Sequence, residues 1–567
     1  MSSSAGPIRP TNYRYAKDSD TFQKIDAVIQ QNLAALRKDG VLTARPGYEI
    51  TGGKVTPNPS VVVTVREKKD RANLPAAQLL PDNLGGFPVD VRQAGAVEKL
   101  RADDPERFAA LAATARNEMK LPEFANERDV TTGKPVTSFE TAAATQQVKK
   151  TQIPYTGPKG FNLDPVEDNM AILCHASPDA GWPTLKTFFG GIKKTLTVGM
   201  YDFTSAHVLQ GLNADLKTAD LTLTLDHPTK NPTADQSDEQ TVATLEASLK
   251  NRMQFAWALE NMDPKAPVFI YPNAYHIKVA VRDSATMWLS SGNWNNSNQP
   301  DIDPINKQPA NFATIAKNSD RDWHVIVTHP GLSKTYEAYL QNDYAVANKA
   351  ETGAGAAAPA AAAPAPAFPL SGKEVAGVTA ELTSASVTPV APTTYFAPKQ
   401  IPANGTAKMK IQPILTPDNY IACVLPLIQS AKKSFYMQTQ YIHPSDKPED
   451  KPLADLINAV IELQKKKVDV KLILSEWEVN GTGGFLEKLQ AAGLDLSAVK
   501  IQNGVHNKGV VVDSSVVMLG SQNWSADGVI RNRDASLIIY NSEAAQYYEQ
   551  IFLHDWANMA QPAAAKG

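Results

Sequence analysis

Two strings in the sequence carry side chains that could act on a phosphoryl group. The first contains His276, Lys278 and Asn293, and the second contains His506, Lys508 and Asn523. An imidazole can attack phosphorus or move a proton, while an ammonium group and an amide can hold non-bridging phosphate oxygens. The residue types in each string therefore point to phosphodiester chemistry.

The spacing within each string suits a strand that leads into a turn. His and Lys two positions apart on a strand point to one face. Asp283 and Asp513 have the opposite parity, and each is followed by serine, a combination typical of a turn. We therefore expect both aspartates to support the structure of the turn rather than the chemistry.

A chain reversal at this turn would bring further polar groups back toward the histidine of the same copy. The returning strands carry Ser291 with Asn293, and Ser521 with Asn523. Asp322 and Asp534 begin the next apolar strands, where a carboxylate can accept from an imidazole N–H and fix its tautomer. These groups are the predicted supporting residues.

The two strings belong to a longer internal repeat. Pro178-Asp179 precedes Lys193-Lys194 by fifteen positions, and Pro417-Asp418 precedes Lys432-Lys433 by the same interval. Copy one, residues 160–350, also contains an insertion. Its Asn293 and Asp322 are 29 positions apart, whereas Asn523 and Asp534 are 11 apart, so copy one has about 18 extra residues. An insertion directly after site residues is expected to border the site.

The paired pattern H-x-K-x4-D-x6-G-S-x-N resembles the HKD signature of the phospholipase D superfamily. Copy two, residues 406–562, matches it fully, while copy one has Ser290 where the family usually has glycine. The resemblance implies an α/β fold with two phospholipase D-like halves related by pseudo-twofold symmetry. It also implies that both motifs meet at one site, without a metal or another cofactor.

The mechanism implied by the resemblance has two steps and passes through a phosphohistidine. One histidine attacks the phosphorus, and the other protonates the leaving oxygen. The resemblance makes His276 the nucleophile, although the residues by themselves allow the reverse.

The rest of the chain divides by composition. Residues 1–150 have a helical pattern from 20 to 38 and short β-branched runs, which predict a small α+β module without evident chemistry. Residues 351–405 are rich in Ala, Pro, Ser and Thr, and are too poor in large apolar residues to build a core. We predict a linker there between the two halves.

Bulk properties exclude few partners. The formal net charge is -3, so the chain as a whole is no polycation for nucleic acid or an anionic membrane. No signal-peptide pattern and no long apolar run is recognisable, which predicts a soluble cytoplasmic protein with, at most, peripheral membrane contact. Two cysteines without metal-ligand spacing indicate no Cys-based metal site.

The substrate is not fixed by the motif, which recognises only a phosphodiester. We favour a phospholipid, with hydrolysis or transfer to an alcohol both open. A nuclease or another phosphodiesterase is the close alternative. The negative net charge of the chain makes a nonspecific nuclease less favoured, because such an enzyme binds many phosphates through Lys and Arg. A catalytically silent binding protein is a third hypothesis, and the intact motif in both copies argues against it.

Overall fold

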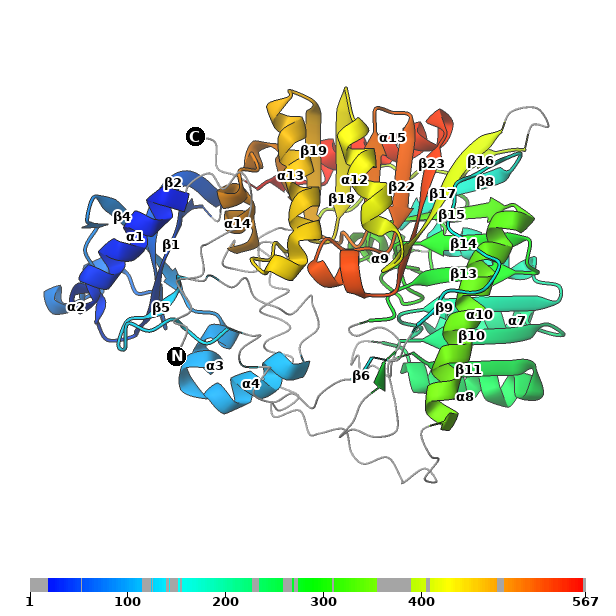
Figure 1. The fold of residues 1–567 in the computed structure, drawn as a ribbon, viewed down its shortest axis with the longest axis horizontal. Helices are drawn as coiled ribbons and strands as arrows, with labels where there is room; N and C mark the ends of the chain where they lie inside the picture. The colour runs from blue at the N-terminus through cyan, green and yellow to red at the C-terminus, as the bar shows by residue number, and fades with distance from the viewer. Residues whose placement is uncertain are drawn as a thin grey trace, which may run out of the picture.

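The computed structural model is a mixed α/β structure containing three large sheets (Figure 1). It describes residues 19–563 apart from 53, 115–123, 125, 139–141, 143–150, 153–154, 227–233, 259–267, 270–273, 308–309, 354–388, 404–407 and 477–483. Most of the predicted linker lies outside the described residues.

The N-terminal sheet has the strand order β3-β4-β2-β1-β5. Ile25 and Ile29 lie one helical turn apart and pack on alternating valines of the sheet, which gives this unit its own core. The helix expected over residues 20–38 is interrupted at Asn32. The elements are α1 (Ser19–Gln31), α2 (Leu33–Leu36), β1 (Val41–Thr51), β2 (Lys54–Val65), β3 (Asn83–Leu84), β4 (Phe87–Gln93), α3 (Ala96–Asp103), α4 (Pro105–Thr114) and β5 (Arg128–Asp129).

The second sheet has eight strands in the order β11-β10-β9-β13-β14-β15-β8-β16. Its strands are β8 (Ala171–Ser177), β9 (Thr195–Met200), β10 (Asp220–Leu225), β11 (Met253–Trp257), β13 (Lys278–Arg282), β14 (Thr286–Ser290), β15 (Asp322–Thr328) and β16 (Lys399–Ile401). The helices of this region are α6 (Gly181–Gly190), α7 (Ala206–Asp215), α8 (Asp238–Leu249), α9 (Phe312–Lys317) and α10 (Pro330–Gly353).

The third sheet has nine strands in the order β24-β20-β19-β18-β21-β22-β23-β17-β7. Its strands are β7 (Val166–Asp168), β17 (Met409–Thr416), β18 (Ser434–Thr439), β19 (Asp469–Ser475), β20 (Val499–Gln502), β21 (Lys508–Val512), β22 (Val516–Gly520), β23 (Asp534–Tyr540) and β24 (Gln561–Pro562). Its helices are α12 (Tyr420–Ser430), α13 (Lys451–Lys465), α14 (Gly484–Ala492) and α15 (Ser542–Asn558). A separate pair joins β6 (Thr151–Gln152) to β12 (Val268–Phe269).

The two larger sheets share the arrangement of seven strands. The run β11-β10-β9-β13-β14-β15-β8 in one corresponds to β20-β19-β18-β21-β22-β23-β17 in the other. The two sheets also exchange edge strands. β7, at the start of copy one, pairs with β17 of copy two, and β16, which precedes copy two, pairs with β8 of copy one. β16 lies inside the segment predicted as a linker, so this part of it is a strand.

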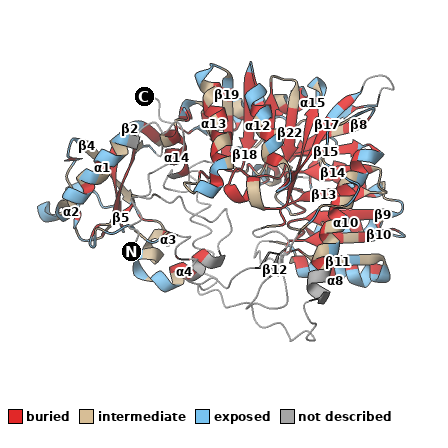
Figure 2. Cartoon of the chain, in the orientation of Figure 1, coloured by how far each residue is buried: buried red, intermediate tan, exposed pale blue. Residues whose placement is uncertain are grey.

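Buried residues follow both large sheets (Figure 2). One apolar cluster combines residues of α10 and α15 with inward-facing residues of both sheets, which ties the two units into a shared core. Helices α6, α7 and α8 cover the other face of the eight-stranded sheet, and α12, α13 and α14 that of the nine-stranded sheet. Among the described residues, none of the helices combines the length and apolar character needed to cross a bilayer.

The N-terminal sheet packs on α14 through a buried charged contact. Glu487 is 2% exposed and accepts hydrogen bonds from Arg45 and Arg92, at 2.6 and 2.9 Å. Burial by itself would raise the pKa of Glu487, but the two arginines outweigh it and lower the pKa. Tyr48 of β1 lies fully buried in the core beneath α14. The N-terminal unit thus shares a core with the nine-stranded sheet.

Candidate active site

The predicted turn of copy one joins β13 to β14. Asp283 and Ser284 have φ angles of 53° and 54°, a left-handed conformation that short polar side chains tolerate better than most. The Asp283 carboxylate accepts hydrogen bonds from the backbone N–H groups of Lys193, Lys194 and Thr195. The aspartate therefore fastens the turn to the start of β9, away from the histidine.

Copy two repeats this arrangement between β21 and β22. Asp513 has a φ of 52° and accepts from the backbone N–H groups of Lys432, Lys433 and Ser434. The doubled lysines of the sequence repeat thus supply backbone donors here.

The histidine of each motif is held by the other copy. His276 Nδ1 contacts Asp534 Oδ1 at 2.7 Å, and His506 Nδ1 contacts Asp322 Oδ1 at 3.0 Å. With Nδ1 occupied, Nε2 of each ring is the nitrogen left for chemistry. The two strings, 230 positions apart in the chain, therefore meet at one place.

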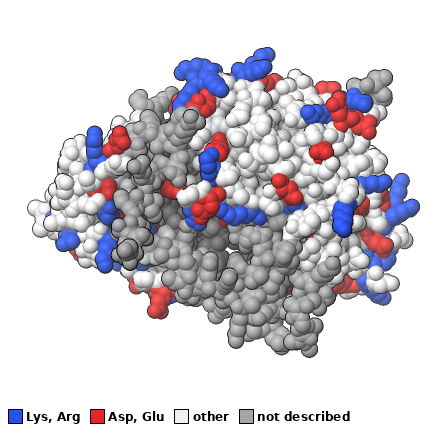
Figure 3. Space-filling model, in the orientation of Figure 1, with Lys and Arg blue, Asp and Glu red and all other residues white. Residues whose placement is uncertain are grey.

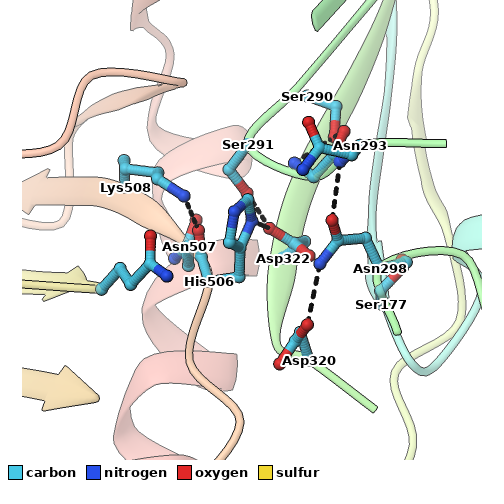
Figure 4. A network of polar contacts seen from close by, with 12 residues as sticks. Ser177, Ser290, Ser291, Asn293, Asn298, Asp320, Asp322, His506, Asn507 and Lys508 are labelled. Atoms are coloured by element: carbon cyan, nitrogen blue, oxygen red, sulfur yellow. Dashed lines mark hydrogen bonds and ion pairs between the residues drawn. The ribbon is translucent and has the colours of Figure 1, made fainter. Parts of the chain in front are cut away.

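The serines support these aspartates. Ser291 Oγ donates to Asp322 Oδ1 and Ser521 Oγ donates to Asp534 Oδ1, both at 2.7 Å. The sequence predicted that each serine lies beside the histidine of its own copy. In the structure, Ser291 instead contacts Asp322, and Asp322 contacts His506 of the other copy (Figure 4), because Asp322 faces that copy where β15 begins.

The lysines and asparagines complete the cluster. Lys278 and Lys508 are 0% and 3% exposed, and each ammonium group donates to the carbonyl oxygen of the histidine two residues before it. Asn293 and Asn523 are also buried, and the side-chain oxygen of each has no hydrogen-bond partner within the described part of the chain. Because amide oxygen and nitrogen can be exchanged by a flip, either group could turn its N–H₂ toward a phosphate.

The two histidine–aspartate pairs differ electrostatically. Burial lowers the pKa of His276 well below its usual range, and Lys278 and Lys508 act in the same direction. Burial also lowers the pKa of His506, as does Lys508, but the charge of Asp322 opposes this. Similar geometry therefore surrounds two imidazoles of unequal proton affinity.

The aspartates of the two pairs differ even more. Burial would raise the pKa of Asp322, but the charge and hydrogen bond of His506 outweigh it and hold the pKa at about 2. Burial raises the pKa of Asp534 to about 7, although Lys278 and Lys508 oppose it. The surroundings of Asp322 thus favour its ionised form, whereas burial favours the protonated form of Asp534.

Sequence reasoning missed the buried arginines next to these aspartates. Arg321 donates to Asp179 of its own copy and to Asp555 of the other, the latter at 2.8 Å. Arg533 likewise donates to Asp418 of its own copy at 2.7 Å and to Asp343 of the other at 2.9 Å. The signal was present in the repeat, since Arg-Asp precedes both strands and an aspartate follows 21 positions after each Asp322 or Asp534.

Copy one has Ser290 where the motif usually has glycine, and the Ser290 side chain contacts a histidine. Ser290 Oγ lies 2.6 Å from His324 Nδ1, and His324 Nε2 lies 2.9 Å from Ser177 Oγ. The positions equivalent to Ser290 and His324 in copy two are Gly520 and Ser536. Copy one thus has the contacting pair Ser290 and His324 where copy two has Gly520 and Ser536.

The first residues of the copy-one insertion contact residues of the site. Asn298, 1% exposed, accepts from the backbone N–H of Asn293 at 2.8 Å and donates to Asp320 at 2.9 Å. Ser177 Oγ donates to the Asn298 carbonyl at 2.6 Å. The first part of the insertion therefore braces Asn293 (Figure 4).

Residues 424–556 match the family described as "Cardiolipin synthase, PLD-like domain". The chain is 30% identical over 131 residues to a phospholipase D of Rickettsia conorii, a match that covers 23% of this chain and only 59% of the relative. It is 26% identical over 158 residues to a mitochondrial cardiolipin hydrolase of Xenopus laevis, covering 26% of this chain and 70% of the relative. The chain thus spans less than two thirds of the Rickettsia protein.

A solved structure, phosphatidylserine synthase from Haemophilus influenzae, aligns with 69% of this chain and 89% of its own at 14% identity and a TM-score of 0.44. The family match contains the second motif, with His506, Lys508 and Asn523. The matched part of the chain, residues 424–556, belongs to the phospholipase D superfamily.

Proposed function

We propose that this protein is a metal-independent phosphodiesterase of phospholipase D type that hydrolyses or transfers a phosphodiester, with phospholipid as the favoured substrate. The observation that carries the proposal is the reciprocal hold on the two histidines, His276 by Asp534 and His506 by Asp322. This hold leaves two Nε2 atoms for the work of a nucleophile and of a proton donor.

In the first step, Nε2 of His276 attacks phosphorus. The bond to the leaving oxygen breaks, and Nε2–H of His506 supplies the proton for that oxygen. In the second step, neutral His506 removes a proton from water or an alcohol, whose oxygen attacks the phosphohistidine and releases His276. Both steps balance in atoms and charge.

The buried cations provide the electrostatic part of this mechanism. Lys278 and Lys508 place two ammonium groups in a nearly water-free environment, where charge stabilises a developing dianion more strongly than it would in water. Asn293 and Asn523 add amide donors for the non-bridging oxygens. Nucleophile, acid and counter-charge are thus all supplied by this chain, which supports metal independence.

We also propose that copy one and copy two form two halves related by pseudo-twofold symmetry, with residues 1–150 as an additional module. The shared order of seven strands supports this, as do the crossed contacts of Arg321 with Asp555 and Arg533 with Asp343. One site at the boundary of the halves follows from it.

The preference for phospholipid rests on two grounds. The proteins similar to this chain include a phospholipase D and a cardiolipin hydrolase. In addition, the lysine, arginine, aspartate and glutamate side chains on the face in Figure 3 are interspersed, and no broad basic track crosses its described residues. Nucleic-acid cleavage is the alternative substrate class and needs a direct test.

The test incubates purified protein with phosphatidylcholine and cardiolipin vesicles, single-stranded DNA and duplex DNA, each with and without chelator. We expect release of a phospholipid head group that chelator does not affect and that His276→Ala abolishes. His329→Asn is the matched control, since asparagine can still accept from the backbone N–H of Leu332 as His329 does. Cleavage of DNA alone would assign the nuclease, and dependence on added metal would exclude the proposed mechanism.

A further inference from the structure

Copy one has a carboxylate near its site where copy two has an amide. Asp320 lies two residues before Asp322, and Asn532 lies two residues before Asp534. Asp320 acts electrostatically on His506, whereas Asn532 brings no charge toward His276. The two otherwise equivalent histidines therefore have different numbers of acidic neighbours.

The position of Asp320 is built into the fold. Its Oδ2 accepts from Asn298 Nδ2 at 2.9 Å, and its backbone N–H donates to the Ser297 carbonyl at 2.8 Å. Both partners come from the insertion, which copy two lacks. On the other side, Gly504 has a φ of 69°, and a Cβ added there would lie 2.8 Å from the Ser319 carbonyl oxygen. Glycine thus allows the segment before His506 to lie against Asp320.

We propose that Asp320, held by Asn298, is a positioning residue that favours the protonated form of His506 and so makes His506, rather than His276, the proton donor. This inference rests on the proposed function and deepens it. The choice between two histidines with the same motif then comes from the insertion, and not from the motif.

The other charged groups around His506 fit this assignment. Asp322, at 3.0 Å, and Asp320 favour the imidazolium, while Lys508 and His276 disfavour it. Glu476 approaches from the end of β19 and accepts from the Gly504 N–H at 3.0 Å. Burial raises the pKa of Glu476 to about 7, and the charge of Asp320 contributes. The equivalent strand of copy one also ends on a carboxylate, Asp226, which accepts from the Tyr275 N–H at 2.6 Å beside His276. The acidic groups of the two sides therefore differ at Asp320, which copy two replaces with Asn532.

Asp320→Asn is the direct test because asparagine retains an oxygen that can accept from Asn298 while losing the charge. With a substrate whose leaving group is an alkyl alcohol, turnover falls as the pH rises through the pKa of His506, which burial holds below its usual value. In Asp320→Asn, the lower pKa of His506 should move this fall in turnover to lower pH by about one unit. At a pH above the wild-type midpoint, the turnover of the variant should therefore be about tenfold lower. With a nitrophenyl leaving group, which needs little protonation, the rate should change less than twofold.

Two variants and one second measurement keep the test decisive. Asp320→Glu should retain most of the wild-type profile, and Asp301→Asn, which removes an exposed carboxylate from the same insertion, should leave the profile unchanged. Histidine-selective NMR titration, with the His506 signal assigned by His506→Gln, should show the lower pKa directly in Asp320→Asn. Melting temperatures establish that each variant is folded.

An unchanged alkaline limb and an unchanged His506 titration in folded Asp320→Asn would overturn the inference. Equal losses with both substrates at every pH would also overturn it, because they would indicate a structural role. If the wild-type protein cleaves no phosphodiester, the proposed function fails, yet the NMR titration still decides whether Asp320 controls the protonation of His506.

Discussion

The two copies agree in framework and differ around the reacting groups. Both use an aspartate to fasten the turn after the motif, and both bury an arginine between an aspartate of their own copy and one of the other. They differ at Ser290 and Gly520, His324 and Ser536, and Asp320 and Asn532. A symmetric frame can therefore support two unequal histidines, because the differences lie in the groups that surround the rings.

Removing either histidine should produce the largest effect. We expect His276→Ala and His506→Ala each to lower kcat by roughly 10² to 10⁴, because positioning alone does not replace a nucleophile or a proton donor. The losses should differ in kind. His506→Ala should partly recover on a nitrophenyl ester, and His276→Ala should not.

Rapid-quench digestion without acid, followed by mass spectrometry, locates the intermediate. A phosphorylated histidine is expected in the peptide that contains His276. A label at His506 would reverse the comparison between the copies, and absence of label at either position under trapping conditions would argue against the two-step mechanism.

Changing the two supporting aspartates should sharpen the same contrast. Asp322→Asn removes the anion that stabilises His506, so we expect a loss of roughly 10²-fold for alkyl leaving groups and much less for nitrophenyl. Asp534→Asn can turn an amide N–H toward Nδ1 of His276 and so place the ring proton on Nε2, which should slow both substrates alike. Identical leaving-group dependence in the two variants would contradict the assigned roles.

The buried arginines should matter equally in both copies. Arg321→Met leaves Asp179 and Asp555 buried without their cation. Arg533→Met leaves Asp343 buried without its cation, while its second partner, Asp418, is exposed. We expect each to lower the free energy of unfolding by about 3 to 5 kcal/mol.

Urea unfolding at pH 7 measures this loss, with Arg71→Met as the control. Arg71 forms an exposed ion pair with Asp82, so that variant should change stability far less. A large difference between Arg321→Met and Arg533→Met would show that the frame itself is asymmetric.

Acid should weaken copy one before copy two. Burial lowers the pKa of His324 to about 4, whereas an unfolded chain would bind the proton near 6.5. The unfolded state therefore binds more protons between these values, and stability falls as pH drops from 6.5 to about 4, by about 3 kcal/mol in total. Copy two has Ser536 at this position and lacks that contribution.

Hydrogen exchange, corrected for the intrinsic effect of pH, should show β15 losing protection at higher pH than β23. His324→Gln should remove most of the difference. Simultaneous loss in both strands would mean that the two units unfold as one.

The sequence predicted the parts of the site that depend on local spacing. An Asp-Ser turn is a local feature, so the turn at Asp283 could be inferred from the string itself. The expected strand begins only at Lys278 in copy one and at Lys508 in copy two, so His276 and His506 lie just before it. Which aspartate holds which histidine depends on how two distant hairpins face each other. No local pattern contains that information, so the crossed pairs and the partners of Arg321 became visible only in three dimensions.

The N-terminal unit illustrates the same limit. Its sequence predicted a small separate module, because its own core is encoded by alternating valines and a short amphipathic helix. Its contact with α14 depends on Arg45, Arg92 and Tyr48, and none of these stands out among the other residues of a surface strand. A buried ion pair between distant segments has no signature in either segment alone.

The contact between Arg45 and Glu487 also bears on how the chain is made. The two residues are 442 positions apart, so the ribosome must add most of the protein before Glu487 emerges. At roughly 5 to 20 residues per second, the N-terminal sheet would wait roughly 20 to 90 seconds with Tyr48 and two arginines uncovered. During that interval the partner that this chain supplies for the surface, α14, is still missing.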